Sequence, residues 1–177
     1  MKRIIIIGYM GAGKTTVGYA LSKLTGWTFY DLDWYIENRM RKSVSELFEE
    51  RGEEGFRQIE TNMLHEVAEF ENVIISCGGG TPCFYNNIDY MNEQGETIYL
   101  KASPEVLFKH IKMTRVSRPL LKDKSPEEVK EFIKEQIAYR EPFYLKAKHV
   151  FDINLLDTRE EIIASASRLK EMIGLQD

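Results

Sequence analysis

The sequence has few cysteines and histidines, and their spacing suits neither disulfide cross-links nor zinc binding. Its cysteines are Cys77 and Cys83, too few for a disulfide framework. The histidines, His65, His110 and His149, lie far apart and show none of the spacings of a zinc site. We therefore expect no disulfide framework, and we expect any bound metal ion to be held by oxygen atoms.

Long apolar runs and an excess of positive charge are also missing. No apolar run approaches about 18 residues and no signal-like segment opens the chain, so we expect a cytoplasmic protein without a membrane partner. The net charge of −4 gives no basic footprint for nucleic acid.

The length and composition are those of one globular domain. The chain has 177 residues, of which 43% are hydrophobic and 29% charged, enough to bury a core without disulfides or metals. No repeat, linker or low-complexity tract divides it. We expect a single domain over residues 1–177 that is a monomer.

Short apolar runs alternate with segments of helical periodicity along the whole chain. The expected strands are 4–7, 27–30, 73–77, 97–100 and 150–153. Helices are expected to begin after Lys14, Ser43, Ser103, Ser125 and Thr158, mostly at capping sequences. The alternation predicts a three-layer α/β fold with a parallel sheet, whose ligands bind at the carboxyl ends of the strands.

The first expected strand runs into a turn with the spacing of a phosphate-binding loop. Gly8, Gly13, Lys14 and Thr15 form the Gly-x-x-x-x-Gly-Lys-Thr P-loop pattern between a strand and a helix. Such a loop binds phosphate through backbone N–H groups and a helix N-terminus, while the lysine reaches the β- and γ-phosphates and the threonine binds Mg²⁺. The alternative is a glycine-rich turn with an exposed lysine. We expect this loop to bind a nucleoside triphosphate.

Two carboxylates follow the second expected strand. Asp31 and Asp33 flank Leu32, so both can leave the strand on the same side and face the phosphate loop. One can hold Mg²⁺ through water, and the other can accept a hydrogen bond from an attacking hydroxyl. The alternative is that they only cap a helix, and Asp33 would suit a helix that begins at Trp34.

Three consecutive glycines, residues 78–80, follow the third expected strand where a motor protein would carry an aspartate. They leave space for a ligand to lie against the backbone, although a mobile turn is the alternative. The guanine-specific Asn-Lys-x-Asp motif is absent, which counts against a GTPase. These features favour a kinase that acts on a small acceptor.

Two arginines indicate that the acceptor is an anion. Arg140 shares a helical stripe with Ile133 and Tyr144, so it should be buried and should meet a carboxylate of the protein or of a ligand. Arg57 can help to bind that carboxylate, or it can pair with Glu60 three residues later.

Residues 114–124 lose the helical periodicity and carry four basic residues, which predicts an exposed loop. Arg115 and Arg118 could close over the triphosphate and neutralise charge on the transferred group, as in a lid. The alternative is a solvated basic loop.

Six segments together resemble the shikimate kinase family over nearly the full chain. They are, in the family's order and at similar spacing, "GYMGAGKTT", "DLD", "FRQIE", "CGGG", "RPLL" and "YREPFY". The resemblance implies a nucleoside-monophosphate-kinase-like P-loop kinase fold with a five-stranded parallel sheet, a helical substrate-binding segment at about 33–60 and a lid at about 112–124. It implies phosphorylation of the 3-hydroxyl of shikimate by ATP with Mg²⁺, giving shikimate 3-phosphate and ADP in chorismate and aromatic amino acid biosynthesis.

The resemblance also implies a role for individual residues. The nucleotide would be bound by Gly11, Ala12, Gly13, Lys14, Thr15, Thr16 and Arg118, and shikimate by Asp33, Arg57, Gly78, Gly79, Gly80 and Arg140. Asp33 would bind the reacting hydroxyl and the two arginines the carboxylate. Mg²⁺ would be held by Thr15 and, through water, by Asp31. The catalytic residues would be Lys14, Asp33 and Arg118.

The sequence departs from the family pattern in two places, and two other functions stay open. Pro82 stands where the family has an aliphatic residue, and no clear adenine-stacking arginine precedes the lid, which leaves Lys112 or Arg115 as candidates. One rival is another small-molecule kinase of the same fold, such as a gluconate or nucleotide kinase. The other is a nucleotide-binding regulatory module without an acceptor.

Overall fold

A parallel sheet of five strands forms the centre of the structure, a computed structural model that describes residues 2–113, 123–153 and 156–175. The strands are β1 (Arg3–Ile7), β2 (Thr28–Asp31), β3 (Val73–Ser76), β4 (Glu96–Lys101) and β5 (His149–Asp152). Their order in the sheet is β2-β3-β1-β4-β5. The expected sheet is therefore confirmed, with strand ends that differ by at most one residue from those expected from the sequence.

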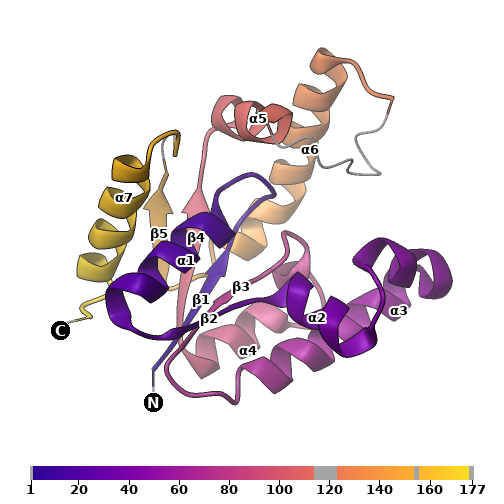
Figure 1. Cartoon of the computed structure of the whole chain (residues 1–177). Helices are drawn as coiled ribbons and strands as arrows, with labels where there is room; N and C mark the ends of the chain where they lie inside the picture. Colours follow the sequence, from indigo (N-terminus) through magenta and orange to yellow (C-terminus); the bar gives the residue numbers. More distant parts are fainter. Residues whose placement is uncertain (1, 114–122, 154–155, 176–177) are drawn as a thin grey trace.

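Helices cover both faces of this sheet (Figure 1). In the described residues they are α1 (Lys14–Thr25), α2 (Leu32–Met40), α3 (Val44–Val67), α4 (Asn87–Gln94), α5 (Pro104–Met113), α6 (Pro126–Tyr144) and α7 (Arg159–Met172), with a short 3₁₀ turn at Thr81–Cys83. Helices α1 and α7 pack together on one face, and α3 and α4 lie toward the other. None of the described helices combines the length and the apolar character that a membrane crossing requires.

Local capping chemistry begins three of the helices. The side chains of Ser43, Ser125 and Thr158 each accept a hydrogen bond from the backbone N–H three residues later. The glutamate at that later position accepts one from the backbone N–H of the capping residue. Gly52 has a left-handed φ of 68° and interrupts α3, as expected for a glycine that ends a helix. The expected segment at about 33–60 is helical, in α2 and in the first part of α3, and its role in substrate binding stays a prediction.

The position of β1 in the core determines where the carboxyl edge of the sheet can bind a ligand. Residues Ile4–Ile7 of β1 are at most 1% exposed because β1 lies at the centre of the sheet with helices on both faces. The chain continues from β1 to a strand at the sheet edge, β2, and β3 then fills the place between them. This is a topological switch point, and the residues after β1, β2 and β3 meet at the carboxyl edge there.

Candidate active site

The phosphate loop, residues 8–15, is wound as phosphate binding requires. Gly11 and Gly13 have left-handed φ angles of 83° and 88°, which side chains disfavour. The Lys14 ammonium donates hydrogen bonds of 2.8 and 2.9 Å to the carbonyl oxygens of Gly8 and Tyr9. Helix α1 starts at Lys14 and carries no acidic side chain in its first turn, so its positive end is not neutralised there.

Two residues that the sequence did not reveal lie against this loop. The ring of His110 in α5 is hydrogen-bonded through Nδ1 to the carbonyl oxygen of Gly11, at 2.7 Å. A Cβ atom on Gly13 would lie 2.4 Å from Cδ1 of Leu156, which follows β5. At Gly13 a side chain would therefore also displace Leu156, in addition to straining the backbone. Neither neighbour has a local sequence signal, because both come from distant parts of the chain.

Thr15 and Asp31, the expected Mg²⁺ residues, are in direct contact. The hydroxyl of Thr15 donates a 2.7 Å hydrogen bond to Oδ2 of Asp31. The other oxygen of Asp31 accepts from the backbone N–H of Trp34 at 3.1 Å, so Asp31 rather than Asp33 caps α2. The helix begins at Leu32, so the alternative in which Asp33 caps a helix that begins at Trp34 is wrong.

The oxygen atoms of this pair suit Mg²⁺. No group of three or more His, Cys, Asp or Glu side chains that could hold a metal ion alone is found within the described ranges. Mg²⁺ needs no such group, because it is usually held by one or two carboxylates together with waters and substrate phosphates. A hydroxyl and a carboxylate beside the phosphate loop therefore fit the ion.

Asp33 is half-buried and lies in negatively charged surroundings beside the glycine run. A Cβ atom on Gly78 would be 3.3 Å from Oδ1 of Asp33. Burial is the main cause that raises the pKa of Asp33 to about 6, followed by the negative charges of Glu60 and Asp31, while Lys14 lowers it. The pKa of Asp33 is thus shifted toward neutral pH, as is typical of a group that accepts or returns a proton.

The three glycines after β3 form a wall beside three polar side chains. A Cβ atom on Gly79 would lie 3.1 Å from the Arg140 guanidinium, and one on Gly80 would lie 2.5 Å from that of Arg57. A Cβ atom on Gly78 would likewise lie close to the carboxylate of Asp33. The same Cβ on Gly79 would be 3.5 Å from the carbonyl oxygen of Gly8, so the phosphate loop adjoins the wall.

Arg57 is buried and is paired within its own helix. Its guanidinium forms a 2.9 Å ion pair with Glu60 and a longer one, of 3.6 Å, with the exposed Glu53. The second oxygen of Glu60 accepts a hydrogen bond of 2.8 Å from Thr81, and burial raises the pKa of Glu60 although Arg57 opposes the shift. Nε of Arg57 has no hydrogen-bond partner among the described residues. Arg57 therefore forms the ion pair with Glu60 and at the same time lies beside Gly80.

Arg140 is half-buried, which corrects the expectation that it would be buried. Its guanidinium lies 5.8 Å from the centre of the Tyr9 ring, and no carboxylate of the described residues forms an ion pair with it. The hydroxyl of Tyr144, one helical turn further along α6, donates to the carbonyl oxygen of Gly79. The positive charge of Arg140 is therefore available to an anionic ligand at the wall.

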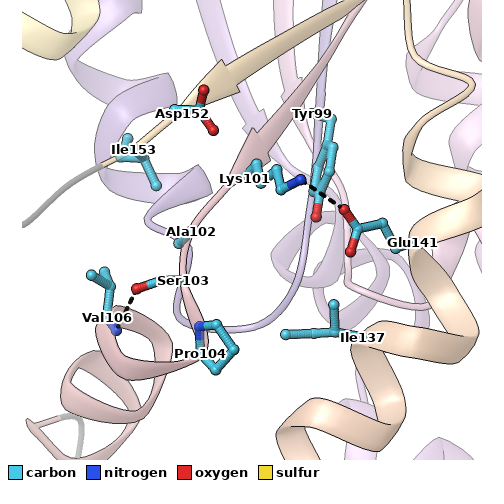
Figure 2. Close-up of a pocket in the computed structure, with 10 residues that line it drawn as sticks. All are labelled: Tyr99, Lys101, Ala102, Ser103, Pro104, Val106, Ile137, Glu141, Asp152 and Ile153. Atoms are coloured by element: carbon cyan, nitrogen blue, oxygen red, sulfur yellow. Dashed lines mark hydrogen bonds and ion pairs between the residues drawn. The ribbon is translucent and has the colours of Figure 1, made fainter.

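Helix α6, which carries Arg140, is also tied to the sheet. Lys101 at the end of β4 forms a 3.1 Å ion pair with Glu141 of α6. Figure 2 shows this pair at one side of a pocket of about 370 Å³ that lies between α5, α6 and the ends of β4 and β5. Glu141 follows Arg140 directly in the sequence, so this ion pair links α6 to β4 next to Arg140.

The expected lid arginines lie outside the described residues. Arg115 and Arg118 fall within 114–122, and the structure describes the expected lid, about 112–124, only at Lys112, Met113, Asp123 and Lys124. Lys112 is exposed in the last turn of α5. The roles expected for the two arginines and for an adenine-stacking residue thus stay predictions.

Comparison with known proteins identifies the family. Residues 10–170 match the family model described as shikimate kinase. The shikimate kinase of Phocaeicola vulgatus is 51% identical over 98% of this chain and 99% of its own length. A crystal structure of shikimate kinase from Bacteroides thetaiotaomicron has a TM-score of 0.96 at 50% identity, covering 98% of this chain and 99% of that one. Shikimate kinase from Acinetobacter baumannii in complex with shikimate has a TM-score of 0.88 at 29% identity, covering 99% and 96%. The chain belongs to the shikimate kinase family.

Proposed function

We propose that this enzyme transfers the γ-phosphate of ATP to the 3-hydroxyl of shikimate, forming shikimate 3-phosphate and ADP. The observation that carries the proposal is the wall of Gly78–Gly80, which faces Asp33, Arg57 and Arg140 and adjoins the phosphate loop. A proton acceptor, two guanidinium groups and a phosphate site are thus close together. The relative from Acinetobacter baumannii, described in complex with shikimate, supports the same acceptor.

The acid end of shikimate is expected to lie between the two arginines. A planar guanidinium binds a carboxylate with two parallel hydrogen bonds, which fixes orientation as well as position. The charge of Arg57 is compensated by Glu60, whereas no described carboxylate pairs with Arg140. Arg140 therefore supplies most of the electrostatic attraction for the anion, and Arg57 mainly fixes the orientation of the carboxylate. The three glycines let the ring lie against the backbone.

The phosphate loop is expected to hold the triphosphate and to stabilise the charge that moves during transfer. Backbone N–H groups of residues 11–16 and the start of α1 would bind the phosphates, and Lys14 would turn from the carbonyl groups it contacts here to the β- and γ-phosphates. Thr15 and Asp31 would hold Mg²⁺, which neutralises phosphate charge when bound. Arg118 is expected to contact the transferred group.

Asp33 is expected to orient the acceptor hydroxyl and to take its proton. The hydroxyl oxygen forms the new bond to the γ-phosphorus, the bond from phosphorus to the ADP oxygen breaks, and the proton passes to the Asp33 carboxylate. A pKa of about 6 keeps most of Asp33 ionised at neutral pH and still lets it hold the proton briefly. Phosphoryl transfer depends mainly on positioning and electrostatics, so orientation is the larger part of this role.

A coupled assay of ADP release tests the proposal. ADP should form in the presence of ATP, Mg²⁺ and shikimate, and it should not form without an acceptor or with gluconate or AMP in place of shikimate. Faster ADP release with gluconate or AMP would assign the chain to another acceptor. Tight ATP binding without turnover on any acceptor would indicate a regulatory module.

We further propose a monomer in the cytoplasm. Both cysteines are free thiols, which fits a reducing compartment, and the acidic balance of the chain offers no nucleic-acid footprint. The site described above is built from one chain. Light scattering coupled to size-exclusion chromatography measures the mass, and a dimer mass would contradict the monomer.

A further inference from the structure

Tyr9 connects the phosphate loop to the helix that carries Arg140. It is the second residue of the loop and is 2% exposed, and its side chain reaches α6. Its hydroxyl donates a 2.7 Å hydrogen bond to Oε1 of Gln136. The face of its ring lies 5.8 Å from Cζ of Arg140, within cation–π distance.

The contacts of α6 have a regular spacing. Gln136, Arg140 and Tyr144 follow one another at intervals of four residues, so they share one face of the helix. Gln136 accepts from the phosphate loop, and Tyr144 donates to the glycine wall at Gly79. Arg140 is held between these two contacts. A shift of the loop at Tyr9 is therefore transmitted to the helix one turn from Arg140.

The backbone of Tyr9 is held by the lysine that the nucleotide recruits. Lys14 donates to the carbonyl oxygens of Gly8 and Tyr9, at 2.8 and 2.9 Å. An ammonium group has only three donors, so Lys14 cannot bind both carbonyls and both the β- and γ-phosphates at once, and at least one of these carbonyl contacts must be given up. The phosphates then fix the loop through several backbone N–H groups in place of one side chain. Nucleotide binding therefore changes how the backbone of Tyr9 is held.

We propose that Tyr9 is a positioning residue that couples the two substrate sites, so that a bound nucleotide fixes Arg140 and tightens the binding of the acid. The inference rests on the function proposed above. Fixing the loop first removes part of the ordering entropy that the acid would otherwise lose on binding. Coupling of this kind is reciprocal: shikimate must tighten ADP binding by the same factor.

Substitutions at the two ends of the hydrogen bond test the link. Tyr9→Phe keeps the ring beneath Arg140 and removes the hydroxyl, and Gln136→Met removes the acceptor with little change of volume. Tyr139→Phe is the matched control, because Tyr139 lies on the same helix, is 70% exposed and contacts Phe143 rather than the loop. Isothermal titration gives the Kd of shikimate with and without saturating ADP and Mg²⁺.

We expect ADP to tighten shikimate binding by roughly 5–150-fold in the wild type and in Tyr139→Phe. The factor should fall to about one in Tyr9→Phe and in Gln136→Met, and the double variant should show no further loss. A residue that only fills space would change stability but not this ratio. Wild-type coupling in a folded Tyr9→Phe or Gln136→Met protein, or no coupling in the wild type, would overturn the inference.

The same samples separate this inference from the proposed function. If the wild type releases ADP in a shikimate-dependent manner but Tyr9→Phe keeps its coupling, only the role of Tyr9 is wrong. If the wild type neither binds nor phosphorylates shikimate, the proposed function fails first. Should Tyr9→Phe not fold, Gln136→Met breaks the same hydrogen bond from the helix side.

Discussion

The guanidinium of Arg57 and the carboxylate of Glu60 form a 2.9 Å ion pair in which both side chains are buried. Arg140 faces the same glycine wall, and no carboxylate within the described ranges pairs with it. The two arginines expected to bind one ligand carboxylate therefore differ in their electrostatic surroundings. Removing Arg57 should therefore mainly change the stability of the fold, and removing Arg140 should mainly change the binding of the ligand.

Arg57→Ala should destabilise the fold, and Arg140→Ala should mainly weaken shikimate binding. Removing Arg57 leaves Glu60 buried without its partner, which costs about 3–5 kcal/mol of unfolding free energy. Removing Arg140 breaks no ion pair of the described protein, so we expect a loss of about 2–5 kcal/mol in shikimate binding and a stability change within about 1 kcal/mol. Urea unfolding and shikimate titration measure the two quantities. An unchanged shikimate KM in a folded Arg140→Ala protein would contradict the proposed binding of the carboxylate by Arg140.

The rate should depend on the protonation of Asp33. Its pKa is raised to about 6, so kcat/KM for shikimate should fall as the pH drops through about 6, because the protonated group cannot accept the hydroxyl proton. Glu60→Gln removes the neighbouring charge that raises this pKa most, so the acid limb should move to lower pH. Glu93→Gln, an exposed change on α4, is the control and should leave the limb in place. An acid limb that does not move in Glu60→Gln would refute the electrostatic link.

Asp33→Asn should stabilise the protein at neutral pH while abolishing most of its turnover. The folded pKa of about 6 lies above the unfolded value of about 3.9, so the folded state binds the proton more tightly and ionisation destabilises it. This destabilisation is absent below about pH 4 and complete above about pH 6, where it reaches at most about 3 kcal/mol. Stability of wild type and variant should therefore differ at pH 7.5 and converge near pH 4.

Denaturant unfolding at the two pH values checks this expectation. Asp89→Asn, an exposed substitution on α4, serves as the control and should bring no gain at pH 7.5. Nucleotide affinity should stay close to that of the wild type in Asp33→Asn, because the expected role of Asp33 concerns the acceptor. Near-wild-type turnover in this variant would remove Asp33 from the mechanism.

Local chemistry in the sequence predicted most of the fold. The capping sequences at Ser43, Ser125 and Thr158 begin helices because the side chain and backbone groups that form each cap are only three residues apart. Helix α4 was missed because it is short and only Ile88 and Met91 give its buried apolar pattern. Patterns of this kind carry information over one or two turns only.

Tertiary contacts in the site could not be predicted in the same way. The hydrogen bond from Tyr9 to Gln136 joins residues 127 positions apart, and no periodicity connects them. The spacing of Asp31 and Asp33 allowed either to cap α2, and contacts with Thr15 and Trp34 decide in favour of Asp31. The three glycines were predicted to leave space for a ligand. The polar side chains beside them could not be predicted, because Asp33, Arg57 and Arg140 come from three different helices, α2, α3 and α6.

Gly80→Ala should weaken shikimate binding and leave ATP binding nearly unchanged. The backbone at Gly80 has a φ of −91°, which alanine adopts without strain, so the effect comes from space alone. The new Cβ would lie 2.5 Å from a guanidinium nitrogen of Arg57, whose movement is limited by its buried pair with Glu60. Shikimate KM should therefore rise at least roughly tenfold, equivalent to about 1.4 kcal/mol. Gly174→Ala is the control: it meets no atom within 4 Å and is strained at φ +68°, so it should lower stability without changing either KM.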